Sequence, residues 1–181
     1  MATRKIVKLG DDALRKVCKP QEKFGIRLNL LLKDMADTMY KAEGVGLAAP
    51  QVGILRRVVV IDVGDGLVEL VNPEITAVSE DTQCGREGCL SLPGRQGVVT
   101  RPMAVKVRAQ DRNGDWFEFE AEGFFARAVC HELDHLDGRL YIDVMDRELT
   151  EEEIGGHIPE DDLPENCADE EEEEAGEDTE A

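Results

Sequence analysis

The residues most able to do chemistry stand in the run His131-Glu132-Leu133-Asp134-His135. The chain has 3 histidines, and two of them lie in this run. On a helix, side chains four positions apart share one face, so the two imidazoles could grip one metal ion. Glu132 could then exchange a proton with water at that ion. The run predicts a hydrolytic metal site, although the same pattern also occurs by chance on amphipathic helices.

A catalytic site of this kind usually has three protein ligands and one open position. The known pattern with a third histidine after Gly138 fails, because Tyr141 stands at that place. A downstream glutamate could come from residues 151–153. Alternatively, Cys89 could supply a thiolate from a loop that we expect to contain no strand. Both sources remain open on this reasoning alone.

The charge of the chain is concentrated at its C-terminal end. Residues 160–181 hold 13 acidic residues and no Lys or Arg, and removing these charges from the total of −19 leaves −6. Such a composition buries too little apolar surface to fold. We therefore expect one catalytic domain over residues 1–147 and a disordered acidic tail over residues 148–181. No basic patch with interleaved aromatic residues is present, so direct nucleic-acid binding is not expected.

The chain shows no signal for a membrane or for export. No stretch approaches the ~20 consecutive apolar residues of a membrane-spanning helix. The first ten residues, MATRKIVKLG, lack the apolar segment of a secretory signal. We expect a monomer that acts in the cytoplasm and does not associate with a membrane.

Two helices are expected to flank several strands. Helical spacing of apolar residues predicts a helix over residues 28–42, which ends at Gly44. A second helix over residues 124–137, closed by Gly138, carries the metal run. Apolar, β-rich or alternating segments predict strands at residues 5–8, 57–63, 67–75, 103–109 and 116–122, and a short strand or extended segment at residues 141–145. Residues 84–97 are expected to be irregular.

Two pairs of these strands should form hairpins. Gly64-Asp65-Gly66 joins one pair and Asn113-Gly114 joins the other. Strands followed by a metal-bearing helix favour an α+β fold. We expect antiparallel sheets packed around a central metal-binding helix, together with an N-terminal helix.

Three segments together resemble the motifs of a known family. Residues 44–51 (GVGLAAPQ), 87–91 (EGCLS) and 131–138 (HELDHLDG) resemble the three motifs of bacterial peptide deformylases, in the same order. The opening RKIVKLGDDALRKVCKP is also similar to the start of that family, and the resemblance covers roughly residues 3–147. Taken alone, the first segment could equally be a tight turn between a helix and a strand.

The resemblance implies a ligand set and a reaction. Cys89, His131 and His135 would hold one metal ion per chain, and Glu132 would act as general acid and base. The reaction would be metal-dependent hydrolysis of the N-formyl group from the formyl-methionine of newly synthesised proteins, with release of formate. The substrate would be met close to the ribosome.

The resemblance also implies how the negative oxygen of the tetrahedral intermediate is stabilised. The donors would be the Gln51 side-chain amide and the Leu90 backbone N–H, and a fixed donor of this kind suits that chemistry. One sulfur and two nitrogens suit zinc or ferrous iron. The family implies Fe²⁺ first and Zn²⁺, or another divalent transition metal, second.

A methionine side chain needs an apolar pocket beside the metal. Helical spacing places Phe124 and Ala128 on the face of the ligands, and Val45 could close the pocket. Core packing would explain Phe124 and Ala128 equally well. Gly46 and Gly88 complete the set of expected substrate-binding residues.

Further expectations concern charged residues and competing functions. Glu87 is expected to pair with Arg101, and Arg127 is expected to point to solvent or to cover a sheet edge. A metallo-endopeptidase with a downstream glutamate ligand is one competing function. A metal-stabilised binding protein without activity is another, but such a site would need neither Glu132 nor Gln51.

Overall fold

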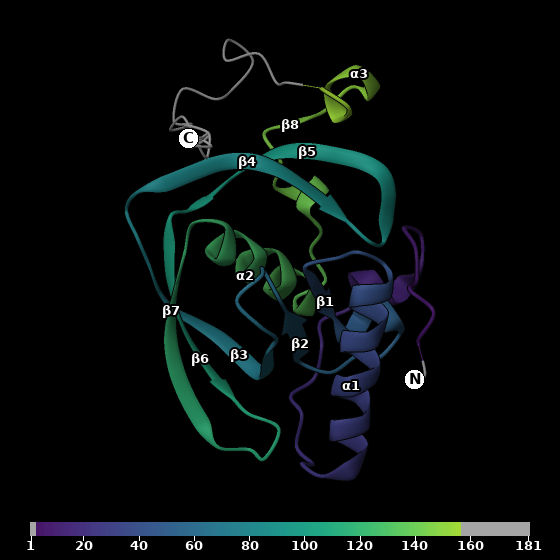
Figure 1. Ribbon diagram of the computed structural model, residues 1–181, viewed down its shortest axis with the longest axis vertical. Coiled ribbons are helices and arrows are strands. Elements are labelled where there is room, and N and C mark those ends of the chain that lie inside the picture. The colour runs from purple at the N-terminus through teal and green to yellow at the C-terminus, as the bar shows by residue number, and fades with distance from the viewer. Residues whose placement is uncertain (1–2, 157–181) are drawn as a thin grey trace, which may run out of the picture.

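The protein is an α+β structure with two antiparallel sheets. A computed structural model describes residues 3–156. One sheet has five strands and the other has three. Helix α2 (Gly123–Leu136) runs through the middle of the molecule between them, and helix α1 (Ile26–Lys41) flanks the larger sheet (Figure 1). The predicted fold class is confirmed.

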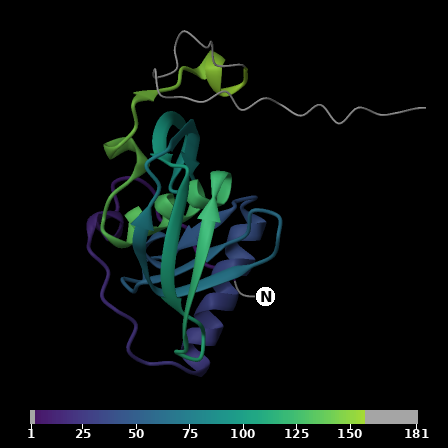
Figure 2. The same cartoon turned by 90° about the vertical axis from the view of Figure 1, so that its left-hand side faces the viewer.

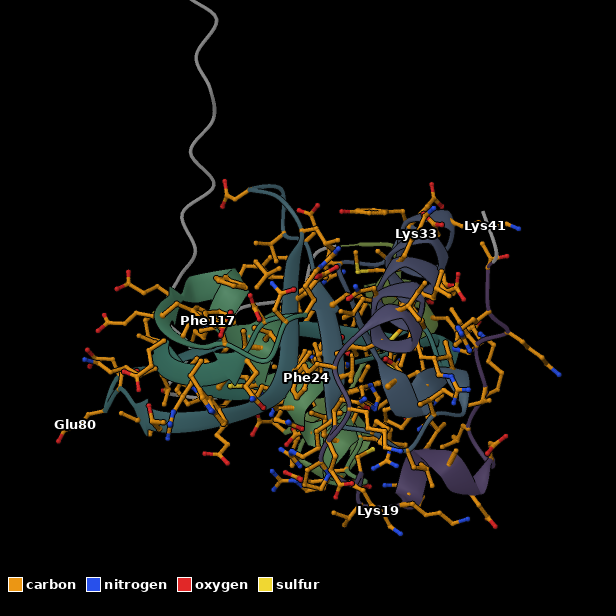
Figure 3. All side chains as sticks on the ribbon, turned by 90° about the horizontal axis from the view of Figure 1, so that it is seen from below. Lys19, Phe24, Lys33, Lys41, Glu80 and Phe117 are labelled. Atoms are coloured by element: carbon orange, nitrogen blue, oxygen red, sulfur yellow. The ribbon has the colours of Figure 1, made fainter. Side chains whose placement is uncertain are left out.

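Helix α1 is amphipathic, as its sequence predicts. Its apolar stripe is buried against the start of the five-stranded sheet and consists of Leu28, Leu31, Leu32, Met35 and Met39. Lys33 and Lys41 project from its exposed side (Figure 3). The helix is confirmed within one or two residues of the predicted bounds.

The five-stranded sheet has the order β1-β2-β3-β6-β7. Its strands are β1 (Gly46–Ala48), β2 (Val58–Ile61), β3 (Val68–Val78), β6 (Ala104–Gln110) and β7 (Trp116–Glu122). Both predicted hairpins are present, β2 with β3 and β6 with β7. All four residues of β2 are buried, because α1 and α2 both pack against this part of the sheet.

The three-stranded sheet arches over α2 (Figure 1). It contains β4 (Thr82–Cys89), β5 (Leu92–Pro102) and β8 (Arg147–Glu148), in that order. The prediction that residues 84–97 are irregular and free of strands is therefore wrong. Their apolar alternation is weak because the buried positions of this hairpin include charged side chains, Glu87 and Arg101.

Helix α2 is buried on almost every side. Each residue from Ala126 to Leu136 is buried, because the two sheets enclose the helix. The edge-on view shows α2 in the interior behind the long strands (Figure 2). This helix carries His131 and His135, so the fold places the predicted metal run in the core.

The segment after α2 differs from expectation. Residues 141–145 do not form a strand; the chain makes a short 3-10 helix, Tyr141–Asp143, and β8 and α3 (Glu151–Ile154) follow. The predicted domain boundary at residue 147 thus falls inside β8. Residues 157–181, which hold most of the predicted tail, lie outside the described residues.

The N-terminal segment is extended but is not a strand, contrary to prediction. Val7 N–H donates to Gln51 O at 2.8 Å, and Leu9 N–H donates to Ser91 O at 2.9 Å. These single bonds go to two different segments, so no continuous ladder forms. In residues 3–156 no helix is long and apolar enough to cross a membrane.

Gly138 permits the turn that ends α2. Its φ is +72°, and a Cβ there would lie 2.7 Å from the backbone oxygen of Arg15. We predict that Gly138→Ala lowers the free energy of unfolding by more than the ~1–2 kcal/mol of a left-handed residue alone, because a backbone clash is added. Urea unfolding measures the loss.

Gly53→Ala is the matched control for this change. Gly53 has φ +78°, and a Cβ there would meet nothing within 4 Å. The control therefore carries only the cost of the backbone conformation. Equal losses in the two variants would show that the Arg15 clash does not matter.

Candidate metal and active site

Three ligand side chains converge at the end of β4 and on α2. The ligand atoms of Cys89, His131 and His135 all lie within 4.8 Å of one another. Cys89 Sγ is 3.3 Å from His135 Nε2, and the two imidazole centroids are 5.0 Å apart. One thiolate and two imidazole nitrogens form a donor set that suits a divalent transition metal.

The competing third ligands are not near this cluster. Within the part of the chain that the structure describes, no other group of three His, Cys, Asp or Glu side chains converges in this way. Residues 151–153 belong to α3, where the Glu153 carboxylate binds Arg147 at 2.7 Å. The geometry therefore favours Cys89 over a downstream glutamate.

Glu87 fixes the orientation of His131. Its Oε2 is 2.9 Å from His131 Nδ1, and Arg101 donates to both carboxylate oxygens at 2.8 and 3.0 Å. Burial alone would raise the pKa of Glu87, but the bonds from His131 and Arg101 outweigh it and lower that pKa to about 2. A charged carboxylate on Nδ1 leaves Nε2 of His131 available to a metal.

The charge network continues through Asp134, which lies between His131 and His135 in the sequence of α2. Arg101 Nη1 donates to Asp134 Oδ2 at 2.7 Å, and Arg139 Nη2 donates to Oδ1 at 2.6 Å. Arg101 therefore bridges the carboxylates of β4 and α2. The expected Glu87–Arg101 pair is present, and it is buried rather than a surface ion pair.

Arg127 does not point to solvent, which was one of its two predicted placements; it binds the backbone of the three-stranded sheet instead. The residue is only 4% exposed. Its Nη1 donates to Val99 O at 2.9 Å, Gly85 O at 3.2 Å and Glu87 Oε1 at 3.3 Å. The reason is that the β4–β5 hairpin, which was not foreseen, covers this side of α2.

Glu132 is buried without a partner for one oxygen. The residue is 5% exposed, and its Oε2 accepts no hydrogen bond from residues 3–156. Burial raises the pKa of Glu132 to about 7, with an opposing effect from His131 and a smaller raising effect from Glu87. A carboxyl group with this pKa can take up and return a proton near neutral pH.

Because Gly46 has no side chain, the Glu132 carboxyl group can occupy the space next to it. A Cβ on Gly46 would lie 2.4 Å from Glu132 Oε1. Strand β1 therefore passes directly beside the carboxylate. The glycine is required for this close approach, so the first motif does more than form a tight turn.

The amide of Gln51 is held with its nitrogen toward the sulfur. Its Oε1 accepts from Ala48 N–H at 2.8 Å, while Nε2 lies 3.3 Å from both Cys89 Sγ and Ser91 Oγ. The residue is fully buried. This arrangement presents an N–H donor at the metal cluster.

Leu90 is held from two sides. The Lys8 ammonium donates to Leu90 O at 2.6 Å, and a Cβ on Gly44 would lie 2.7 Å from the Leu90 side chain. This contact of Lys8 could not be predicted from the sequence. A lysine in an N-terminal extended segment carries no pattern that predicts which carbonyl it will bind.

A pocket of about 410 Å³ opens onto the cluster. This volume is typical of sites for small ligands. All five predicted substrate-binding residues lie in its wall: Val45, Gly46, Gly88, Phe124 and Ala128. The wall also includes Cys89, His131, Glu132, Gln51 and Leu90, whereas His135 is not part of it.

The exposure of two helix residues distinguishes pocket from core. Phe124 is 53% exposed, so it lies at the mouth of the pocket and not in the core. Ala128 is 6% exposed; it lines the pocket and also packs in the core. The wall also contains Arg86, Arg95 and Gln96, which the sequence did not single out. They come from the unforeseen β4–β5 hairpin.

Comparison with known proteins agrees with this geometry. Residues 3–151 match the family profile described as polypeptide deformylase. The chain belongs to the polypeptide deformylase family. A peptide deformylase from Caldicellulosiruptor bescii is 59% identical over 154 residues, which cover 85% of this chain and 92% of the relative. Another from Caldanaerobacter subterraneus is 55% identical over 86% of this chain and 98% of its own length.

Solved deformylase structures have the same fold. The crystal structure of peptide deformylase from Thermotoga maritima has a TM-score of 0.80 and 44% identity, and covers 81% of this chain and 99% of that one. A deformylase from Synechococcus elongatus, in complex with actinonin, has a TM-score of 0.78 and 39% identity over 81% of each chain. Deformylases remove the N-formyl group from nascent peptides in a metal-dependent reaction, and this chain is an enzyme of that kind.

The buried Glu87 network generates a prediction about metal affinity. Glu87→Gln keeps the size of the side chain but removes the charge that faces Arg101 and His131. We expect metal affinity to fall about 10–100-fold, because such supporting carboxylates orient the ligand. Stability should fall by several kcal/mol, because the buried guanidinium groups of Arg101 and Arg127 each lose a charged partner. Competition with a chelator and urea unfolding measure the two effects.

Glu69→Gln is the control for the loss of an ion pair. Glu69 lies on β3 of the five-stranded sheet and binds Arg112, whose side chain is half exposed. Neither residue lines the pocket at the metal cluster. A surface pair of this kind contributes little. If both variants lose metal equally, Glu87 has no special role at the site.

Proposed function

We propose that Cys89, His131 and His135 hold one metal ion and that this site hydrolyses the N-formyl group of formyl-methionyl peptides. The observation that carries the assignment is the convergence of the three ligand atoms with the buried Glu132 carboxyl and the Gln51 amide at one pocket. A binding protein with a structural metal site would need neither of the last two groups. Such a site would also fill its fourth position with protein.

Ferrous iron is the metal that we propose, with zinc as the second candidate. A divalent cation in this site supplies a Lewis acid that makes a water molecule a nucleophile near neutral pH. The sulfur and two nitrogens suit both metals. An iron–thiolate site is sensitive to oxygen through oxidation of Cys89, so iron loading requires anaerobic conditions.

Glu132 is the proposed general base and general acid. Its carboxyl group is buried at the pocket wall and its pKa of about 7 lies close to the working pH. It takes a proton from the attacking water and later returns it to the amine that leaves. Both transfers can go through one side chain because the attacking oxygen and the leaving nitrogen are bonded to the same carbon in the tetrahedral intermediate.

Gln51 and Leu90 are the proposed donors to the developing negative oxygen. The Nε2 of Gln51 points toward the metal cluster, since Ala48 N–H holds Oε1 on the other side. The backbone N–H of Leu90 follows Cys89 directly in the chain. Loss of one donor of this kind typically costs ~100–1000-fold in rate.

The pocket wall is the proposed site for the methionine side chain. Val45, Phe124 and Ala128 supply the apolar surface, while Gly46 and Gly88 keep side chains out of the space next to the ligands. Apolar contacts discriminate by only ~1–3 kcal/mol per methylene. Substrates with an unbranched side chain of similar length should therefore be accepted as well.

We propose that the enzyme works as a cytoplasmic monomer on chains that leave the ribosome, without binding RNA. The acidic C-terminal sequence supports the absence of RNA binding, because the phosphates of RNA would repel it. Removal of residues 157–181 should therefore leave kcat/KM for a short formyl peptide unchanged. A large loss in that assay would contradict a catalytic domain that is independent of the tail.

Hydrolysis of formyl-Met-Ala-Ser tests the function. Protein purified anaerobically with iron should release formate, whereas Glu132→Ala should release almost none. The variant should retain one metal per chain, because Glu132 is not a ligand in this proposal. Metal analysis and sedimentation of the same preparation check iron content and monomeric state.

Cys89→Ala separates this function from an endopeptidase with a downstream glutamate ligand. The change should abolish metal binding here and would hardly matter in that alternative. If the wild-type protein binds metal but releases no formate, the proposed reaction is wrong, and cleavage of an internal peptide bond is then the next activity to assay.

A further inference from the structure

Arg127 joins the two parts of the chain that carry the proposed metal ligands. It precedes His131 by four positions on α2, so the two side chains share one face of the helix. Its guanidinium reaches the β4–β5 hairpin, and β4 ends at Cys89. Figure 1 shows this hairpin arching directly over α2.

The contact is made to both strands at one position. Gly85 and Val99 are paired across the hairpin, and Arg127 Nη1 donates to the carbonyl oxygens of both. Backbone carbonyls cannot move without moving the strands. The guanidinium therefore fixes the distance between the β4–β5 hairpin and α2 at this position.

Gly85 allows the strand to come this close. A Cβ on Gly85 would lie 3.0 Å from Arg127 Nη2 and 3.1 Å from Cζ. No positive φ is involved, so the glycine is needed for space and not for backbone conformation. A side chain at this position would press on the guanidinium.

Glu87 connects the same arginine to His131. Arg127 Nη1 donates to Glu87 Oε1, while Oε2 of that carboxylate binds His131 Nδ1. Glu87 also stands two residues before Cys89 on β4. Arg127 thus acts on the sulfur ligand through the strand and on the imidazole ligand through the carboxylate.

We propose that Arg127 is a positioning residue that sets the distance between Cys89 and His131 and thereby the geometry of the metal site. It acts through the β4–β5 backbone and through Glu87, and it does not touch the reacting atoms. The inference rests on the ligand set proposed above. An arginine with a merely structural role would support the fold without affecting the ligand geometry.

Cobalt substitution reads this geometry without any activity assay. Co²⁺ bound by Cys89, His131 and His135 gives d–d bands that report coordination geometry and a thiolate-to-metal charge-transfer band that reports the sulfur ligand. In Arg127→Met we expect both sets of bands to shift. We also expect cobalt to dissociate about tenfold faster or more, as for other supporting residues of metal sites.

Arg57→Met is the matched control. Arg57 also ties a strand to the C-terminal end of α2, since it donates to Oδ1 of Asp137, the residue after the helix, at 2.7 Å and to Pro73 O on β3 at 3.2 Å. Its side chain is mostly buried. It contacts neither Glu87 nor a proposed ligand. The control should lose stability while its cobalt spectrum and dissociation rate remain those of the wild type.

The outcomes separate this inference from the ligand assignment. Wild-type spectrum and dissociation rate in folded Arg127→Met would overturn the positioning role. If that variant does not fold, Gly85→Ala takes its place, because it pushes on the guanidinium without removing any charged group. Shifted bands then support the proposal and unchanged bands overturn it. Absence of a thiolate band in the wild-type protein would instead refute Cys89 as a ligand.

Discussion

The structure depends on one buried carboxylate, that of Glu87. Its two oxygens receive Arg101, Arg127 and His131, which come from β5 and α2. A buried charge is tolerated only when it is well paired and hydrogen-bonded, so these segments must meet at this point. Their meeting brings Cys89 on β4 close to the two histidines on α2. The metal cluster is therefore a consequence of satisfying this charge.

Close backbone approach is the second constraint on the site. Gly46 lets β1 pass beside Glu132, and Gly85 lets β4 pass beside Arg127. Each glycine removes a Cβ that would displace a charged side chain of α2. The helix can then be enclosed from two directions while its polar groups keep the positions that the chemistry requires. Apolar packing alone would not need this spacing.

The sequence predicts the regular elements well and the charged hairpin poorly. Helix α1, helix α2 and two hairpins follow from apolar periodicity and turn residues, because their buried positions are apolar. The β4–β5 hairpin was missed because some of its buried positions hold charged residues such as Glu87 and Arg101. A hydrophobicity pattern assigns such residues to the solvent-exposed face. The same reasoning predicted that Arg127 points to solvent or covers a sheet edge, whereas it is buried beneath this hairpin. The candidate ligands could be predicted because a motif is recognised from residue types and their spacing, with no need for the fold. The positions of the Lys8 and Arg127 side chains depend on tertiary contacts that local spacing does not encode.

Two glutamates near one metal cluster have opposite properties, and their surroundings explain the difference. Glu87 and Glu132 are both buried, but Arg101 and His131 lower the pKa of Glu87 to about 2, while burial raises that of Glu132 to about 7. Environments that separate the pKa values of two carboxyl groups separate their roles. Glu87 remains an anion that orients a ligand, and Glu132 can exchange a proton. If the arginines bonded to Glu132 instead, it would hold its charge and could no longer act as an acid, so the role proposed for Glu132 requires that Arg101 and Arg127 bind Glu87.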